Sequence, residues 1–163
     1  MKKLRGIIAV ILLVILDQVT KILAKGRLEF GESIVIIKKV FRLQYLENTG
    51  AAFGILKDKL WFFIILTSIV IIIIGYVYFK MPETKRYKPI KLVLILITAG
   101  AIGNLIDRIV HNYVIDFLYF ELIDFPIFNV ADCYVTISAI LLVILVIFYY
   151  KEDDFSFLQK DDK

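Results

Sequence analysis

The sequence predicts a mainly α-helical membrane protein with four transmembrane helices and a small extracytoplasmic β-sheet, a cradle, between the first two helices. Of its 163 residues 60% are hydrophobic, and the mean hydropathy is +0.82. A soluble domain is usually nearer half apolar and mixes its polar residues throughout. Here the apolar residues form blocks, and segments 60–79 and 133–150 carry no charged residue. A bilayer core takes about 20 helical residues, so each of these segments spans it unaided.

Four spans follow from the blocks, at about 6–24, 60–80, 90–110 and 130–150, within a single integral membrane domain over 1–163. The first and third apolar runs are short, at 7–16 and 92–106, so these helices must include polar neighbours to reach full length. Basic residues precede the first run, as in a signal peptide, but no small-residue cleavage site follows it. The sequence therefore predicts an uncleaved first helix.

The charges of the connecting loops predict the orientation. The loop at 109–129 contains no Lys or Arg, whereas the loop at 80–91 is strongly basic. Cytoplasmic loops carry an excess of Lys and Arg, so 80–91 is predicted inside, 109–129 outside, and both termini in the cytoplasm. The connection at 25–59 is predicted outside although it also contains basic residues. The difference between the 80–91 and 109–129 loops is given more weight, because these loops flank a single short helix. The basic residues of the 80–91 loop are Lys80, Lys85, Arg86, Lys88 and Lys91.

The outer connection, at about 28–57, is predicted to be rich in β-structure. Phe41, Leu43 and Tyr45 alternate with polar residues, which is the period-2 pattern of a half-exposed strand. Segment 34–37 is its expected partner. The tail from Lys151 onward is short and charged and is predicted to be mobile.

A first group of polar residues lies in the first span. A charge at mid-bilayer costs about 2.5 to 3.5 kcal/mol on insertion scales, so such residues usually have a function or a partner. Asp17 and Lys21 are four residues apart and can form an ion pair on one helix face. Two interpretations stay open: a structural pair that anchors the outer end of the helix, or a role in placing a substrate.

A second group ends the third span. Asn104, Asp107 and Arg108 share one helix face. They are typical either of helix–helix contacts with an arginine reaching the headgroups, or of a site where Asn104 and Arg108 donate hydrogen bonds to a peptide carbonyl.

A third group lies between the third and fourth spans. Asn129 is predicted to cap the fourth helix, with Asp132 at its third position, where a carboxylate is favourable. This capping role explains Asp132 without any catalytic function, but it does not explain Asp116 in its hydrophobic surroundings. The segment between the two carboxylates is short, so both are expected at the same membrane face.

Two carboxylates that meet in a partly desolvated site share one proton. The ionised member can then take a proton from water while the other polarises a scissile carbonyl, as in aspartic proteases. The sequence predicts no cofactor and no metal site, because its single histidine, His111, and single cysteine, Cys133, do not make a triad or a zinc site.

The order and spacing of five short blocks resemble the bacterial lipoprotein signal peptidases (signal peptidase II, prolipoprotein signal peptidase). The blocks are Asp17-Gln-Val-Thr-Lys21, Glu47-Asn48-Thr-Gly50-Ala51-Ala-Phe53, Gly103-Asn104-Leu-Ile-Asp107-Arg108, Val114-Ile-Asp116-Phe117 and Phe128-Asn129-Val-Ala131-Asp132.

The resemblance implies an aspartic endopeptidase of the bacterial cytoplasmic membrane with its active site toward the outer face. Its substrates would be prolipoproteins already carrying a diacylglyceryl group, cleaved before the lipidated cysteine. The expected partners are these substrates, membrane lipid and cyclic peptide inhibitors of the globomycin type, with no nucleic acid, and the chain is expected to be a monomer. By the same resemblance the catalytic residues are Asp116 and Asp132, the substrate-binding or supporting residues are Asn48, Gly50, Asn104, Arg108 and Asn129, and the structural residues behind them are Asp17, Lys21 and Asp107.

Two other functions remain possible at this point. A small transporter or proton channel could use Asp17, Asp107, Asp116 and Asp132 as relay groups, although no inverted repeat or broken helix is visible. A membrane scaffold without enzymatic activity would use the same polar residues for helix packing.

Overall fold

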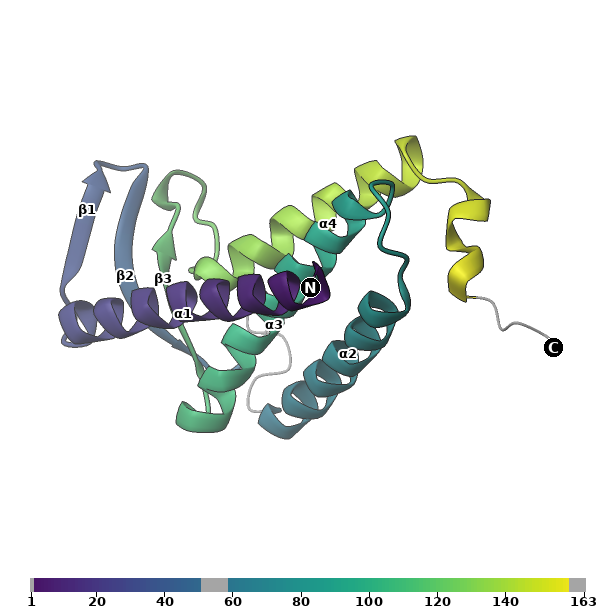
Figure 1. Cartoon of the computed structure of the whole chain (residues 1–163). Helices are drawn as coiled ribbons and strands as arrows, with labels where there is room; N and C mark the ends of the chain where they lie inside the picture. The colour runs from purple at the N-terminus through teal and green to yellow at the C-terminus, as the bar shows by residue number, and fades with distance from the viewer. Residues whose placement is uncertain (1, 51–58, 159–163) are drawn as a thin grey trace.

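The computed structural model of this chain describes residues 2–50 and 59–158 (Figure 1). Within these ranges four helices are long and apolar enough to cross a membrane, which confirms the predicted spans. The first and third helices extend beyond their expected ends, because polar residues continue both helices past the apolar runs. The helices are α1 (Lys2–Leu28), α2 (Leu60–Lys80), α3 (Lys88–His111) and α4 (Val130–Phe148).

Helix α3 is the centre of the helical part and packs against α1, α2 and α4. Figure 1 shows α1 crossing in front of α3, while α2 lies to one side. Two glycines of α3 permit the close approach of its neighbours. A Cβ atom at Gly100 would lie 2.5 Å from the Ala131 carbonyl oxygen of α4, and one at Gly103 would collide with Asp17 Oδ2 of α1. Small residues at these crossings therefore bring three helices together at one level.

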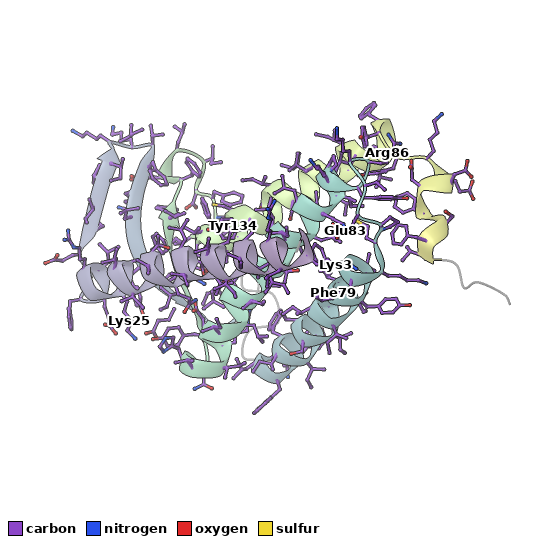
Figure 2. All side chains as sticks on the ribbon, in the orientation of Figure 1. Lys3, Lys25, Phe79, Glu83, Arg86 and Tyr134 are labelled. Atoms are coloured by element: carbon purple, nitrogen blue, oxygen red, sulfur yellow. The ribbon has the colours of Figure 1, made fainter. Side chains whose placement is uncertain are left out.

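The distribution of side chains is the reverse of that in a soluble protein. No residue of α2 is buried, and large apolar side chains such as Trp61 and Phe148 are 73% and 80% exposed. Figure 2 shows side chains on every side of α2, including the side that faces away from the other helices. Several polar and charged residues are instead buried among apolar ones, which is the arrangement expected of a protein surrounded by lipid. The buried polar residues are Asp17, Lys21, Asp107, Asp116, Asn129 and Ser138.

A three-stranded antiparallel sheet lies at one end of the helices, in the order β1-β2-β3. β1 (Ser33–Ile37) and β2 (Phe41–Asn48) form the predicted hairpin between α1 and α2. The third strand, β3 (Val114–Tyr119), comes from the segment between α3 and α4 and was not predicted. Its first four residues are all buried, so it lacks the alternating pattern that reveals a half-exposed strand. Part of the predicted outer loop, 51–57, lies outside the described residues.

The first half of β3 rests on the C-terminal end of α1. Ile115 and Phe117 form an apolar cluster with Ala24 and Leu28 of α1. This packing fixes the height and rotation of β3 relative to the helices, and Asp116 lies between the two packed residues.

The charged tail contains a short helix in the part that the structure describes. After the short 3-10 helix η2 (Glu121–Ile123) and α4, the 3-10 helix η3 (Glu152–Leu158) packs back against the loop between α2 and α3. Arg86 donates to both carboxylate oxygens of Asp154, at 3.0 and 2.6 Å. These hydrogen bonds lower the pKa of Asp154 to about 2. The sequence gives no sign of this contact because its two halves lie far apart along the chain.

Candidate active site

Asp116 lies on the buried face of β3 and is 1% exposed. β2 pairs with β3 so that Leu46 faces Asp116, which puts Asn48, two residues along β2, on the same face as a diagonal neighbour. Asn48 Nδ2 donates to Asp116 Oδ2 at 2.8 Å. The other oxygen, Oδ1, accepts from Asn129 Nδ2 at 2.7 Å. Both carboxylate oxygens are thus held by side-chain amides.

Asp132 stands in the first turn of α4. Its Oδ2 accepts from the Asn129 backbone N–H at 3.0 Å, and the Asn129 side chain accepts from the Asp132 backbone N–H at 3.0 Å. This reciprocal capping box is the predicted N-cap arrangement. Oδ1 of Asp132 accepts from Asn104 Nδ2 at 2.8 Å. One oxygen therefore serves the helix terminus, while the other is tied to α3.

Asn129 and Asn104 connect the two carboxylates. Asn129 Nδ2 donates to Asp116 Oδ1 and also to Asn104 Oδ1, at 3.1 Å. Asn104 in turn donates to Asp132. The chain of contacts Asp116–Asn129–Asn104–Asp132 fixes the relative placement of the two acids through rigid amides. The structure thus brings both predicted aspartates into one site, at the end of the helices where the sheet lies (Figure 1).

The surroundings of Asp116 favour its neutral form. Burial raises the pKa of Asp116, and the negative charge of Asp132 raises it further. The hydrogen bonds from Asn48 and Asn129 and the charge of Lys21 act in the opposite direction. The net result is a pKa of about 7 for Asp116, against an ordinary value of 3.8. A carboxyl group with this pKa exchanges a proton near neutral pH, which suits general acid–base chemistry.

Lys21 is the buried cation behind the site, with a side-chain exposure of 1%. Its Nζ lies 3.0 Å from Asp17 Oδ2 and 3.0 Å from Asp107 Oδ2. It also donates to Asn104 Oδ1 at 2.9 Å. The predicted Asp17–Lys21 pair therefore exists, and it includes Asp107 and reaches the amide that contacts Asp132.

The two acids paired with Lys21 also bind backbone groups of the elements that carry Asp116 and Asp132. Asp17 Oδ1 accepts from the Ala131 backbone N–H at 2.8 Å, next to Asp132 in α4. Asp107 Oδ2 accepts from the Ile115 backbone N–H at 3.0 Å, next to Asp116 in β3. The Lys21 cluster thus holds the main chain beside each candidate catalytic residue.

Arg108 lies at the side of the site. Its guanidinium donates to the Gly50 carbonyl at 3.2 Å and lies 4.7 Å from the centre of the Phe63 ring. Asn104 was expected to point a donor at the same spot, but its N–H group contacts Asp132 instead. A carboxylate accepts a stronger hydrogen bond than a neutral carbonyl, which explains this orientation.

A groove of about 970 Å³ runs past both aspartates. Asn48, Gly50, Asn104 and Arg108 contribute its polar wall. The remaining wall is largely apolar and comes from β2, the segment between β3 and α4, and the first two turns of α4. Several of these apolar residues are exposed at the molecular surface, including Phe120, Ile123 and Phe125, which are 42%, 68% and 44% exposed. The groove therefore joins an acid–base pair to a surface suited to lipid.

Sequence reasoning assigned no role to several residues of the site. Gln18 donates to Asp107 Oδ1 at 2.9 Å and to the Gly103 carbonyl at 3.2 Å, so it joins α1 to α3. Its position between Asp17 and Lys21 is the one signal that could have identified it. Cys133 and Thr136 of α4 also line the groove. Their sequence positions do not reveal this, because it depends on which face of α4 is turned toward β3.

The geometry supports hydrolysis by a pair of carboxylic acids. Both acids face one groove, one of them titrates near neutral pH, and amides fix their positions. Among the described residues, no group of three or more His, Cys, Asp or Glu side chains is arranged to hold a metal ion.

Comparisons with known proteins agree over nearly the whole chain. A sequence model of the family described as Signal peptidase (SPase) II matches residues 9–148. A lipoprotein signal peptidase of Clostridium tetani (strain Massachusetts / E88) is 49% identical over 152 residues, which cover 91% of this chain and 94% of that protein. A lipoprotein signal peptidase of Streptococcus pyogenes serotype M5 (strain Manfredo) is 42% identical over 158 residues, covering 95% of this chain and 99% of that protein.

Solved structures agree with the fold as well. A bacterial membrane enzyme determined by the in meso method at 2.3 Å superposes with a TM-score of 0.80 at 34% identity, covering 98% of this chain and 93% of that one. A second, at 1.9 Å, gives a TM-score of 0.77 at 35% identity, covering 90% of this chain and 94% of that one.

Proposed function

The chain belongs to the signal peptidase II family, and we propose that Asp116 and Asp132 are the catalytic pair with which it cleaves prolipoproteins. The enzyme is a multi-pass membrane peptidase of an aspartic type that removes signal peptides from prolipoproteins. The observation that carries the assignment is the hydrogen-bonded path from Asp116 through Asn129 and Asn104 to Asp132. Asp116 and Asp132, which have different surroundings, both line the same groove.

The surroundings of the two acids suggest different roles. Asp116, with a pKa of about 7, supplies the proton, and the Asp132 carboxylate accepts one. The Asp132 anion is supported by the Asn129 backbone N–H, the Asn104 amide and the positive end of the α4 dipole. Each of its oxygens has further lone pairs, so a water molecule can bind beside these donors.

The reaction then proceeds in two balanced steps. The water oxygen attacks the scissile carbonyl carbon while its proton passes to Asp132 and the Asp116 proton passes to the carbonyl oxygen. The resulting diol collapses, the C–N bond breaks, the proton on Asp132 passes to the leaving nitrogen, and a diol proton returns to Asp116. Both acids end in their starting states.

The polar wall supports the substrate backbone in this proposal. Arg108 holds the Gly50 carbonyl and lies beside the aspartates. Asn48 donates to Asp116, and its Oδ1 accepts from the Gly50 N–H at 2.9 Å, so Asn48 holds both Asp116 and the Gly50 backbone beside the groove. Asp17, Lys21 and Asp107 act from behind the groove by holding the main chain next to both acids.

The apolar wall suggests a lipid-bearing substrate. A diacylglyceryl group on the cysteine that follows the scissile bond would lie in the membrane against Phe120, Ile123 and Phe125, close to the aspartates. Binding energy from the acyl chains would then position the scissile peptide bond at the aspartates. Because enzyme and substrate lie in the same membrane, they would meet by diffusion in two dimensions instead of three. Cyclic peptide inhibitors of the globomycin type would compete for the same groove. We expect the chain to act as a monomer, because one copy supplies both aspartates.

The orientation follows from charge. The basic 80–91 loop lies at the end of the helices opposite to the sheet (Figure 1), so both termini would be cytoplasmic and the aspartates would face outward. A transporter or proton channel is not favoured, because the family is a peptidase family and the carboxylates gather at one end of the helices.

Purified enzyme incubated with one prolipoprotein, with and without its diacylglyceryl group, tests the substrate assignment. We expect cleavage of the lipidated form before its cysteine and a loss of at least about 100-fold without the lipid. Equal rates of cleavage of both forms would show that the enzyme does not recognise the diacylglyceryl group.

A further inference from the structure

A second cavity lies far from the aspartates, between α1, α2 and α3 at the end of the helices where the basic 80–91 loop lies. Its volume is about 210 Å³, smaller than the roughly 300 to 1,000 Å³ of pockets that enclose whole small molecules. Its walls are almost wholly apolar and include Ile7, Val10, Gly75, Tyr78, Ile95 and Ile102. The shape and lining suit a segment of one acyl chain.

Gly6 and Tyr78 form one wall of this cavity. A Cβ atom at Gly6 would collide with the Tyr78 hydroxyl, so a larger residue at position 6 would displace the Tyr78 side chain from this wall. Gly75 has the opposite surroundings: a Cβ atom there would meet nothing within 4 Å. The space beside Gly75 is therefore open, and the missing side chain widens the cavity.

Two lysines stand above the cavity on the helix faces that line it. Lys3 lies on the face of α1 that carries Ile7 and Val10, and Lys91 lies on the face of α3 that carries Ile95. Lys3 Nζ donates to the Phe79 carbonyl and lies 6.0 Å from the centre of that ring. Lys91 Nζ lies 5.8 Å from the centre of the Tyr78 ring. Tyr78 and Phe79 both line the cavity.

One acidic residue shares this end of the cavity. Glu83 forms an ion pair with Lys91 at 2.8 Å, and Figure 2 shows Lys3 and Phe79 close together beside the end of α2. Two ammonium groups and one carboxylate leave a net charge of +1 above an apolar cavity. The first turns of α1 and α3 lie at the same end and add the positive ends of two helix dipoles.

We propose that this cavity is a binding site for an anionic phospholipid of the cytoplasmic leaflet, with an acyl chain between α1, α2 and α3 and its phosphate beside Lys3 and Lys91. Charge complementarity selects the anionic headgroup over a zwitterionic one, since anionic lipids attract basic side chains at the membrane surface. The site uses the opposite end of the helices from the prolipoprotein groove and does not depend on the catalytic assignment.

Native mass spectrometry of the full-length protein, titrated with phosphatidylglycerol or with phosphatidylcholine of the same acyl chains, tests the proposal. We expect one phosphatidylglycerol to bind at least about fivefold more tightly than phosphatidylcholine, because one lysine at the membrane surface contributes about that factor. Lys3→Gln should remove this preference, and Glu83→Gln should increase it. Soluble glycerol phosphate should not displace the lipid.

A matched pair of substitutions tests the cavity itself. Gly75→Leu fills the cavity and should weaken binding of both lipids, whereas Gly26→Leu, at another position where a Cβ meets nothing within 4 Å, should leave binding unchanged. Equal affinity of the wild-type protein for the two lipids would overturn the proposal, as would unchanged binding in Gly75→Leu. A dimer that Gly75→Leu dissociates would also overturn it, because the cavity would then hold a second copy of this chain. Thermal unfolding of each variant identifies any that fails to fold, and Lys3→Gln at the partly exposed rim remains decisive in that case.

Discussion

Asn129 holds Asp116 with its side-chain amide, at 2.7 Å, although the two residues belong to different elements, the start of α4 and strand β3. The same side chain caps α4 through its oxygen, which accepts the Asp132 backbone N–H. A single asparagine therefore fixes the first turn of α4 and one of the two proposed catalytic acids. The two tasks use different atoms, so substitution can separate them.

Asn129→Ser should retain folding and lose activity. Serine is as good an N-cap as asparagine, but it has no amide to donate to Asp116. We expect kcat to fall by about 100-fold from the misplaced acid, with little change in Tm. Asn129→Ala is the comparison: it should lose the same activity and also about 1 kcal/mol of stability, because the cap is lost too. Full activity in Asn129→Ser would show that the contact with Asp116 is dispensable.

The pH profile should report the proton on Asp116. If Asp116 must be protonated, kcat/KM falls as pH rises through its pKa of about 7. The Asn48 hydrogen bond lowers this pKa, so Asn48→Ala should move the alkaline limb to higher pH. If the alkaline limb of the Asn48→Ala profile stays at the wild-type pH, the limb belongs to a group other than Asp116.

The same raised pKa also links folding to pH. Folded Asp116 keeps its proton up to about pH 7, whereas the unfolded group releases it near 3.8. Its contribution to stability is therefore fully present below pH 3.8 and is lost as pH rises toward 7. Asp116→Asn removes this dependence, so the Tm of that variant should fall less over this range than the wild-type Tm.

Removing Lys21 should destabilise the fold more than removing a neighbouring lysine. Lys21→Met leaves Asp17 and Asp107 buried without their cation, which costs about 3 to 5 kcal/mol. Lys25→Met, one turn later, breaks a partly exposed pair with Glu29 at 3.6 Å and a hydrogen bond to the Tyr113 hydroxyl at 2.9 Å, and should cost only about 1 to 2 kcal/mol. Unfolding in detergent measures both, and equal losses would contradict a structural role for the buried cluster.

The crossing of α1 and α3 should depend on Gly103. Gly103→Ala puts a methyl group against Asp17 Oδ2, and overpacking of this kind costs about 1 to 3 kcal/mol. Gly75→Ala is the control, because its methyl group meets nothing and should be neutral or stabilising. Thermal melts distinguish the two, and a Gly103→Ala protein as stable as wild type would mean that Asp17 can move aside.

Local patterns predicted those parts of the structure that depend on neighbouring residues. The four spans followed from apolar length, and the hairpin of β1 and β2 followed from alternation around Phe41. The ion pair of Asp17 with Lys21 followed from their spacing, and the capping box followed from Asn129 and Asp132.

Contacts between distant elements could not be predicted in the same way. Asp107 joins Lys21 only because small residues bring α1 against α3, and that crossing has no local signature. β3 is buried on both faces, so its pattern differs little from that of a buried helix turn. The contact of Arg86 with Asp154 joins segments that two membrane spans, α3 and α4, separate along the chain. The pairing of Asp116 with Asp132 was expected from their blocks, whereas its route through Asn129 and Asn104 required coordinates.

The most direct test measures cleavage of a lipidated prolipoprotein by Asp116→Asn and Asp132→Asn enzymes, each with its Tm. Asp124→Asn is the control, since Asp124 is an exposed residue of the same segment with a positive φ of 47° that asparagine tolerates. We predict that both active-site variants fold and lose at least about 1,000-fold in kcat, whereas Asp124→Asn cleaves like wild type. Cleavage at a wild-type rate by either Asp116→Asn or Asp132→Asn would contradict the assignment of these two acids as the catalytic pair.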